Sequence, residues 1–431
     1  MSVDDAIKKA ENQESTNVVK MPIPFTITQS GTIKANSLRN IGLILEQDEI
    51  LKGTFAYNEF SFADEVIKSI PQLHIKCGYV EDNYISSILR YIEDKYGVLF
   101  TERLLQMAVS NDAQSNSYNP VKKYLEEAEK EWDGEQRVAL LLPEFLGVEI
   151  SEVTTLQTKI FFVGAVAKVF NPNSKFDYVL DLVGGQGVGK TTFLKKISNG
   201  WYTDQFTDFK DKDSYMNMQR ALIVNDDEMT ATNNSDFETL KKFISSEELE
   251  YRPPYGRSAV RRPKNFVIAR TTNESTYLKD KTGERRFMPN MANKRRQIKS
   301  PITDLTPEII KQFWGECVHY YKEGFNFMLS DEENELLEKN RKSFMYIDEA
   351  ETQIEEVLAG WPGTFITSSQ IAKELGEENL IKNRKLAKKI KYIMDNHREW
   401  EPSQKRINGI PKRGYKKCRH CWHYVVTKIQ C

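Results

Sequence analysis

The 431-residue sequence has few features of a secreted or membrane protein. Five cysteines are too few for a disulfide framework, and nothing at the start of the chain resembles the charged and apolar segments of a secretion signal. The longest apolar run, Ile160–Phe170, is shorter than the roughly twenty apolar residues that a membrane span needs, and it contains Lys168. We therefore expect a soluble protein of the reducing cytoplasm.

The sequence also lacks an excess of charge of either sign, with 61 Lys and Arg residues against 62 Asp and Glu residues. This balance neither favours nor excludes nucleic acid as a partner. The charge is unevenly distributed, because residues 251–300 hold 14 Lys and Arg against 3 Asp and Glu, and residues 361–431 hold 16 against 6. Both segments are candidates for contacts with phosphate groups. The alternative is a solvated surface that acidic neighbours balance in the fold.

Apolar material is sufficient for several packed cores, with 39% hydrophobic and 11% aromatic residues. The patterning along the chain predicts four parts. Residues 1–20 are polar and form a short helix or a disordered lead, and residues 21–150 mix short strands with helices as an accessory domain. Helices and apolar strands alternate in residues 151–340, as in a parallel α/β sheet, and residues 341–431 form a basic domain resembling a winged helix.

A glycine-rich loop is the strongest functional signal in the sequence. The apolar strand Tyr178–Val183 precedes the loop and an amphipathic helix follows it, which is the context that a phosphate-binding loop requires. Backbone N–H groups and the positive end of the helix bind phosphate oxygens, while Lys190 holds the β and γ phosphates of ATP and Thr191 binds Mg²⁺. The predicted nucleotide-binding residues are Gly184, Gly185, Gln186, Gly187, Val188, Gly189, Lys190, Thr191 and Thr192.

Three adjacent carboxylates follow the next predicted strand, Ala221–Val224. Hydrolysis of ATP needs one acidic group near the metal and another that polarises the attacking water. We expect Glu228 to orient the water and either Asp226 or Asp227 to bind Mg²⁺. The alternative is an exposed acidic turn after a core strand.

Two further signals complete the predicted catalytic residues. A third apolar strand ends near Asn273, whose amide can hydrogen-bond the γ phosphate or the attacking water. Arg285 and Arg286 follow a glycine-containing turn, and guanidinium groups stabilise the charge on a transferring phosphoryl group, in ring ATPases commonly from the adjacent subunit. The alternative for both arginines is a surface position without a role.

Long segments of the chain resemble the virulence-associated protein E family, a superfamily-3-like branch of the AAA+ P-loop helicases of phages and pathogenicity islands. The most specific similarity runs from Phe237 to Asn290, with YRPPYGR, TTN and GERRF in this order, and Asn119–Val138 and Lys175–Ile197 add to it. The chain departs from the family at Asn225, where the family usually carries a glutamate. The resemblance implies ATP-driven unwinding of DNA in replication.

The resemblance also implies a β-hairpin between the acidic strand and Asn273, which projects into a ring channel and contacts the DNA backbone. Pro253, Pro254 and Gly256 provide its turn, and its alternative role is to bridge subunits or bind nucleotide in trans. Basic helices near the C-terminus are candidates for contact with duplex DNA. The predicted DNA-binding residues are Arg252, Tyr255, Arg257, Arg261, Arg262, Lys264, Lys388 and Lys389.

These features predict an α/β fold with an AAA+ P-loop core, a helical or α+β N-terminal region and a winged-helix-like C-terminal domain. The predicted function is an ATP- and Mg²⁺-dependent DNA helicase of a phage or other mobile element, acting as a homo-oligomeric ring, most simply a hexamer, with a primase or other replication protein as a further partner. A replication initiator or loader without unwinding activity, and a non-motor interference or assembly factor, are the alternatives. Whether Cys418 and Cys421 bind zinc stays open.

Overall fold

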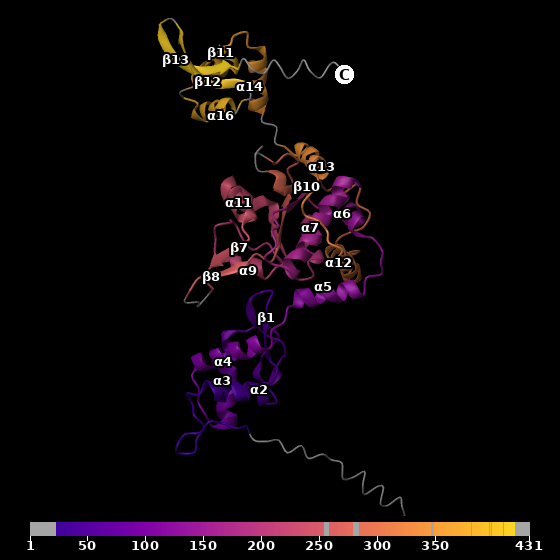
Figure 1. Ribbon diagram of the computed structural model, residues 1–431, viewed down its shortest axis with the longest axis vertical. Helices are drawn as coiled ribbons and strands as arrows, with labels where there is room; N and C mark the ends of the chain where they lie inside the picture. The colour runs from indigo at the N-terminus through magenta and orange to yellow at the C-terminus, as the bar shows by residue number, and fades with distance from the viewer. Residues whose placement is uncertain are drawn as a thin grey trace, which may run out of the picture. The chain divides into compact units, whose positions relative to one another are not determined.

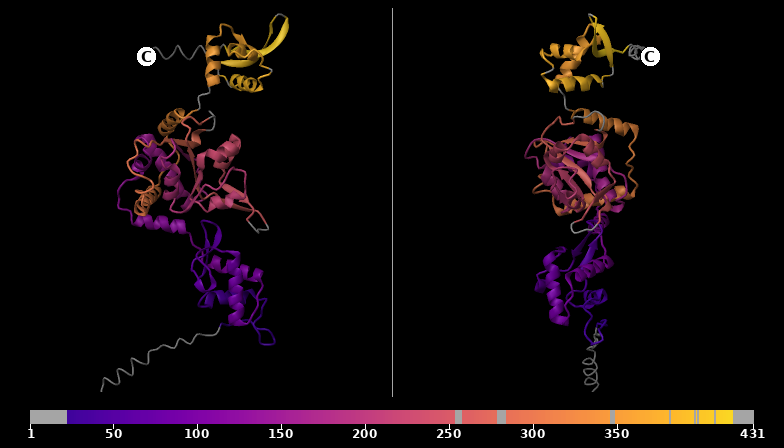
Figure 2. Two further views of the ribbon diagram at one scale, coloured as in Figure 1. Left: turned by 180° about the vertical axis from the view of Figure 1, so that it is seen from behind. Right: turned by 90° about the vertical axis from the view of Figure 1, so that its left-hand side faces the viewer.

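The computed structural model describes residues 23–253, 258–278, 284–345, 349–380, 382–395, 397, 399–407 and 409–418. The predicted lead of residues 1–20, the hairpin residues Tyr255 and Arg257, and Cys421 lie outside these described residues. The chain divides into two compact units: one comprises Met1–Ser275 and Thr282–Arg341, and the other comprises Thr276–Lys281 and Lys342–Cys431. Figures 1 and 2 show the elements of both.

The first described part of the chain is a small α+β arrangement with its own hydrophobic core. Ser37 and Thr101 accept backbone N–H bonds in the first turns of two of its helices, which favours helix formation at these points. Its antiparallel sheet consists of β1 (Phe55–Asn58), β2 (Ala63–Val66) and β3 (Gly78–Tyr79), and its helices are α2 (Leu38–Gln47), η1 (Pro71–Leu73), α3 (Asp82–Tyr96) and α4 (Glu102–Ser115).

A five-stranded parallel sheet organises the remainder of the first unit. In spatial order its strands are β10 (Phe287–Met291), β4 (Val179–Val183), β9 (Val267–Thr272), β6 (Ile223–Asp226) and β5 (Tyr202–Thr203). Val183 pairs with Thr272 on one side and with Met291 on the other, so these strands end at the same edge. The prediction of a mixed α/β fold with a parallel sheet is confirmed.

Helices precede, connect and follow the strands of this sheet, and several of them contribute to a large hydrophobic core. They are α5 (Pro120–Lys130), α6 (Val138–Leu146), α7 (Glu152–Phe170), α8 (Lys190–Ile197), α9 (Ser214–Gln219), α10 (Thr230–Asn234), α11 (Phe237–Ser245), α12 (Pro307–Lys322) and α13 (Asp331–Lys342), with the short turns η2 (Asp227–Met229) and η3 (Glu284–Arg286). In Figure 1, α6, α7 and α12 lie together on one side, away from α11 and the hairpin of β7 (Glu248–Tyr251) and β8 (Val260–Pro263). Apart from Phe60, the residues of this core start at Val121, ahead of the border at residue 150 that the sequence predicts.

Helix α7 passes through the centre of this core. Among the described residues it is the one helix long and apolar enough to cross a membrane, and 72% of its apolar window is buried inside the protein. Phe161 and Phe162 have no exposed surface, and Phe162 packs edge-on against Phe313 and Trp314 of α12. The helix is therefore accounted for as a core helix.

The second unit contains three helices and a small antiparallel sheet around a third core. Its elements follow the chain as α14 (Glu349–Gly360), β11 (Phe365–Ile366), α15 (Ser368–Glu374), α16 (Arg384–Asp395), β12 (Trp400–Ile407) and β13 (Ile410–Lys417). Strand β13 lies between β11 and β12, and Thr367 forms a reciprocal cap with Gln370 at the start of α15. Ile390, Ile393 and Met394 are the buried residues of α16.

Candidate nucleotide-binding and catalytic site

The glycine-rich loop connects the fully buried strand β4 to helix α8. Gly184, Gly187 and Gly189 have φ angles of 146°, 81° and 93°, a region that glycine adopts without strain. A Cβ atom on Gly184 would lie 2.4 Å from the carbonyl oxygen of Ala292. Both the backbone conformation and the packing therefore require glycine at this position, as the predicted phosphate-binding loop does.

Lys190, the first residue of α8, is buried beneath this loop with 8% of its surface exposed. Its ammonium donates to the carbonyl oxygens of Gly184 and Gly185 and, at 3.0 Å, to Oδ1 of Asn273. Burial lowers the pKa of Lys190, while the charges of Asp227 and Glu228 oppose this change. Two predicted catalytic residues, Lys190 and Asn273, thus meet at the carboxyl edge of the sheet.

Asp226 and Asp227, between which the sequence does not decide as the metal ligand, have different surroundings in the structure. Asp226 is 1% exposed and accepts hydrogen bonds from the N–H groups of Ala231 and Thr232 and from the Thr232 hydroxyl, at 2.6 to 2.9 Å. Burial raises the pKa of this carboxyl despite these donors. Asp226 therefore holds the turn that leads into α10 rather than facing the loop, which favours Asp227 over Asp226 for the predicted metal ligand.

Asp227 is the carboxylate that faces the phosphate loop. Its Oδ1 accepts hydrogen bonds from the Thr191 and Thr271 hydroxyls, both at 2.7 Å, and from the Asn225 amide at 3.2 Å. Mg²⁺ prefers oxygen ligands and takes only one or two from the protein, leaving the others to phosphates and water. The neighbouring oxygens of Thr191 and Asp227 fit this ion. Among the described residues, no group of three or more His, Cys, Asp or Glu side chains suited to a metal occurs.

Glu228 is exposed and has an unusual backbone conformation. Its φ angle is 52°, and Met229 after it has the same value, in a region that side-chain-bearing residues rarely occupy. Each such residue costs about 1–3 kcal/mol and persists only where its surroundings hold it. The N–H of Glu228 donates to the Thr271 hydroxyl at 2.9 Å. The strained turn at the end of β6 is therefore anchored to β9.

The arginine pair lies at the opposite edge of the sheet. Phe287, the residue after Arg286, pairs with Val179 at the start of β4, whereas the phosphate loop follows the end of that strand. Five strand residues separate the two edges by roughly 16 Å. The side chain of Arg285 is 73% exposed and lies 3.9 Å from Asp177, whereas Arg286 is 16% exposed, lies 3.5 Å from Asp177 and donates to Ser245. Arg285 is therefore the more accessible of the two.

The predicted DNA hairpin corresponds to β7 and β8, which pair as antiparallel strands. Arg252 is exposed, and Arg261 is exposed but bonded to Glu250 at 2.7 Å. Arg262 donates to the carbonyl oxygen of Phe62 at 3.1 Å and lies over the Phe62 ring. This part of the hairpin is packed against other protein residues, and the tip with Tyr255 and Arg257 is outside the described residues.

The prediction that Lys264 binds DNA is wrong. Its side chain is buried, with 3% of the residue exposed, and its ammonium donates to the carbonyl oxygens of Phe243 and Ile244 near the end of α11. Burial, together with the charge of Lys168, lowers its pKa to about 7. Lys264 therefore supplies hydrogen bonds to a helix end instead of charge to a surface.

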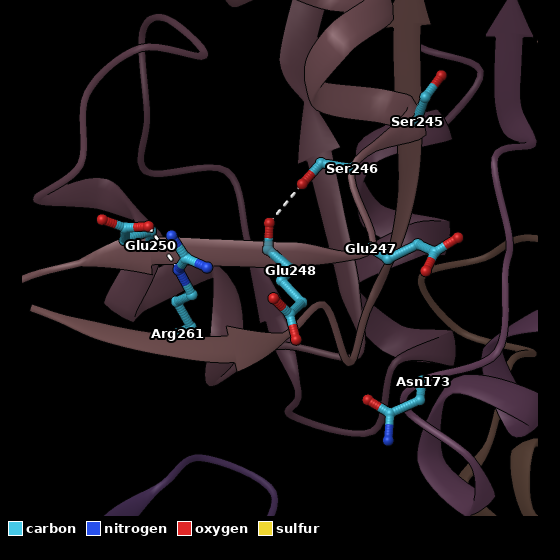
Figure 3. A pocket seen from close by; sticks show the side chains of 7 residues that line it. All are labelled: Asn173, Ser245, Ser246, Glu247, Glu248, Glu250 and Arg261. Atoms are coloured by element: carbon cyan, nitrogen blue, oxygen red, sulfur yellow. Dashed lines mark hydrogen bonds and ion pairs between the residues drawn. The ribbon is translucent and has the colours of Figure 1, made fainter.

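A pocket of about 500 Å³ lies at the base of the hairpin (Figure 3). Figure 3 shows the ion pair between Glu250 and Arg261 beside two further carboxylates, Glu247 and Glu248. Its other lining residues are Asn173, Ser245 and Ser246. Three glutamates repel phosphate groups, so the base of the hairpin is not suited to DNA.

In the second unit, α16 has a basic exposed face. Lys388 is exposed and Lys389 is half-buried, and the other exposed residues of this face are Arg384, Lys385, Lys391 and Tyr392. On the adjacent β-ribbon, Lys405 pairs directly with Lys412. Like charges at directly opposite positions destabilise a β-ribbon, so an anionic partner would be stabilising here.

Sequence reasoning did not identify four residues that support the site. Thr271 and Asn225 contact Asp227, and Arg270 forms a two-pronged ion pair with Asp181 at 2.6 and 2.7 Å. A signal for the last two was present, because each is a lone charge within an apolar segment that predicts a buried strand. Since buried charges need partners, two such strands with opposite charges predict a pair.

The fold and this edge of the sheet define a mixed α/β protein built on a parallel sheet with a glycine-rich loop. The chain belongs to the virulence-associated protein E-like family, because the model of that domain matches residues 125–346. This match confirms the resemblance seen in the sequence. No curated protein matches the chain.

Two solved structures match this chain at low identity. The A form apo structure of the C-terminal region of NrS-1 shares 16% identity, over 84% of this chain and 96% of that chain, with a TM-score of 0.40. A second A form apo structure of the same region shares 16% identity over the same fractions, with a TM-score of 0.38.

Proposed function

We propose that this protein is an ATP- and Mg²⁺-dependent DNA helicase of a phage or other mobile element, with an AAA+ core that works as a hexameric ring. One observation carries the proposal: Lys190, Thr191, Asp227 and Asn273 meet at the carboxyl edge of the sheet, while Arg285 is exposed at the amino edge. A guanidinium that cannot reach the phosphate loop of its own chain fits the loop of a neighbouring copy.

The residues at the carboxyl edge divide the work of hydrolysis. The loop N–H groups and Lys190 hold the phosphates, Thr191 and Asp227 hold Mg²⁺, and Glu228 orients the attacking water. Asn273 lies within hydrogen-bond distance of Lys190 and is placed to sense the γ phosphate. Bound Mg²⁺ neutralises charge on the phosphates. Arg285 of the adjacent subunit completes the site, and Arg286 supports the segment on which Arg285 lies.

DNA contacts are proposed for both units. In the first, Arg252 and the hairpin tip with Tyr255 and Arg257 would follow one strand in the ring channel, with stacking and phosphate contacts. In the second, we propose a winged helix, which the order of helices and strands from α14 to β13 supports, and Lys388 and Lys389 on α16 would hold duplex DNA. Such contacts weaken steeply with salt and read little sequence.

Two other functions use the same site. A replication initiator or loader would bind and hydrolyse ATP in order to assemble other replication proteins, such as a primase, without unwinding DNA. An interference or assembly factor would use nucleotide only to oligomerise. An ATP-hydrolysing motor is favoured over the assembly factor because the site holds two carboxylates of different environment and because a cation is exposed for a neighbour, which a purely structural module does not require.

Strand displacement on a forked duplex tests the proposal. The wild-type protein is expected to separate the strands with ATP and Mg²⁺ at low salt. Glu228→Gln should retain ATP binding and lose hydrolysis by about a hundredfold or more, because it removes the group that activates water. Intact ATP hydrolysis without strand displacement would replace the helicase by the loader.

A further inference from the structure

The hydrogen bonds around Asp227 are unevenly distributed between its two carboxylate oxygens. Oδ1 accepts from Thr191 and Thr271 at 2.7 Å and from Asn225 at 3.2 Å. Oδ2 accepts from no donor among the residues that the structure describes. Three donors on one oxygen fix the orientation of the carboxylate.

From this geometry we infer that Thr271 and Asn225 are positioning residues that reserve Oδ2 of Asp227 for Mg²⁺. The inference rests on the proposed ATPase site and adds to it two residues that touch neither nucleotide nor metal. Both residues act through Asp227. Thr191 differs from them, because its hydroxyl is itself a proposed ligand of the ion.

Thr271 also links the metal-binding acid to the water-orienting acid. Its hydroxyl donates to Asp227 and accepts from the N–H of Glu228 at 2.9 Å, which is within the hydrogen-bonding capacity of a hydroxyl group. Glu228 has a φ angle of 52°, so this hydrogen bond also holds a strained residue. A single side chain on β9 therefore contacts the carboxylate of Asp227 and the backbone of Glu228. Asn273, two residues further on, contacts Lys190.

Asn225 contributes through its lack of charge. It has no exposed surface, and its amide nitrogen donates to Asp227 and to the Tyr202 hydroxyl at 2.9 Å. The reverse amide orientation would place Oδ1 of Asn225 against a carboxylate oxygen, so the observed orientation is the favoured one. A carboxylate at this position would repel Asp227 at close range.

The first test compares Thr271→Val with Thr271→Ser, because valine keeps the shape of threonine and serine keeps its hydroxyl. Binding of a fluorescent ADP is measured with Mg²⁺ and with EDTA, together with kcat and KM for ATP. We expect Thr271→Val to bind ADP in EDTA as tightly as the wild type does. The increase in ADP affinity that Mg²⁺ produces should be roughly tenfold smaller. The variant should also lower kcat about tenfold to a hundredfold with little change in KM. Thr271→Ser should stay within about threefold of the wild type in each quantity.

The second test is Asn225→Asp, which keeps the shape of the side chain and adds a charge. We expect a loss of the Mg²⁺-dependent gain similar to that of Thr271→Val, since the new carboxylate repels Asp227. The far-ultraviolet circular dichroism and the melting temperature of each variant are compared with those of the wild type, and Asn225→Asp decides the outcome if valine disturbs folding.

The outcomes separate this inference from the proposed function. Thr271→Val and Asn225→Asp with the wild-type gain from Mg²⁺ would overturn the positioning role. A wild-type protein that binds ADP more tightly with Mg²⁺ but never hydrolyses ATP would overturn the motor, while the binding measurements still decide the role of Thr271. A wild-type protein with no gain from Mg²⁺ would overturn both.

Discussion

The two edges of the parallel sheet hold their charged residues in different ways. At the carboxyl edge, Lys190 is 8% exposed and Asp227 accepts three hydrogen bonds, so both side chains have one defined position. At the amino edge, the side chain of Arg285 is 73% exposed and lies 3.9 Å from Asp177, a distance and exposure at which an ion pair contributes little. One edge is a preorganised site, and the other presents a cation outward. Two copies of the chain, edge to edge, would combine them.

The largest predicted effect comes from two variants that each remove the cation of one edge. Lys190→Ala removes the phosphate-binding cation of one edge, and Arg285→Ala removes the exposed cation of the other. Each variant alone is expected to lose about a thousandfold in ATP hydrolysis, since a guanidinium supplied in trans contributes that much. An equal mixture should recover about a quarter of the wild-type activity, because random assembly pairs intact edges at one interface in four. ATP turnover against mixing ratio measures this recovery.

The matched control for this experiment contains no Arg285 in any subunit. Arg285→Ala is mixed with the double variant Lys190→Ala, Arg285→Ala, and this mixture should stay inactive. A single variant Arg285→Ala with wild-type turnover would contradict the combination of the two edges. Arg286→Ala is expected to affect stability more than turnover, because this side chain is 16% exposed and bonded to Ser245.

The second prediction concerns the buried ion pair that connects the strands between the two edges. Arg270 pairs in register with Asp181 on one side and Asp226 on the other, and it lies 3.9 Å from the Phe287 ring. Its side chain is 2% exposed and that of Asp181 is fully buried. Arg270→Met should lower the free energy of unfolding by about 3–5 kcal/mol, because it leaves a buried carboxylate without its partner. Urea unfolding followed by tryptophan fluorescence measures the change.

A double variant distinguishes the loss of a partner from the loss of packing. Arg270→Met combined with Asp181→Leu removes both charges and should be more stable than Arg270→Met alone by more than about 1 kcal/mol. If the double variant is less stable than either single variant, the strands are held by shape rather than by charge.

The parts of this site that the sequence predicts are those that lie close together along the chain. The strand, the glycines and Lys190 form one segment, whose spacing determines their geometry. The end of β9 is also recognisable, since Asn273 follows an apolar run. The parallel sheet follows from alternating helices and strands, and the structure confirms it.

The parts that the sequence does not predict depend on which way a side chain points. Asp226 and Asp227 are neighbours in the chain, yet one caps a helical turn and the other faces Thr191. The two side chains point in different directions because β6 ends at Asp226 and because Glu228, the residue after Asp227, has a left-handed backbone conformation. Lys264 belongs to a basic segment by composition, but its ammonium binds the carbonyl oxygens at the end of α11, a contact between residues about twenty positions apart.

The smallest predicted effect is a dependence of stability on pH that comes from the amino edge. Lys264 has a pKa of about 7 in the folded protein against an ordinary value of 10.5, because burial and the nearby charge of Lys168 disfavour its charged form, while Asp177 favours it. Between these two pKa values the unfolded chain binds more protons than the folded chain. The free energy of unfolding should therefore rise with pH above about 7.

Two methionine variants determine whether Lys264 causes this slope. Lys264→Met removes the titrating group and keeps a long apolar side chain, so the rise of stability with pH should become clearly shallower. It should not vanish, because burial also lowers the pKa of Lys168, to about 8. Lys388→Met, at an exposed position, should keep the wild-type slope. Urea unfolding at several pH values gives each slope, and equal slopes for Lys264→Met and the wild type would mean that the lysine is charged inside the folded protein. The amino edge would then hold a buried charge stabilised by its carbonyl partners alone. In holding a buried, charged lysine it would resemble the carboxyl edge more closely than the burial of Lys264 predicts.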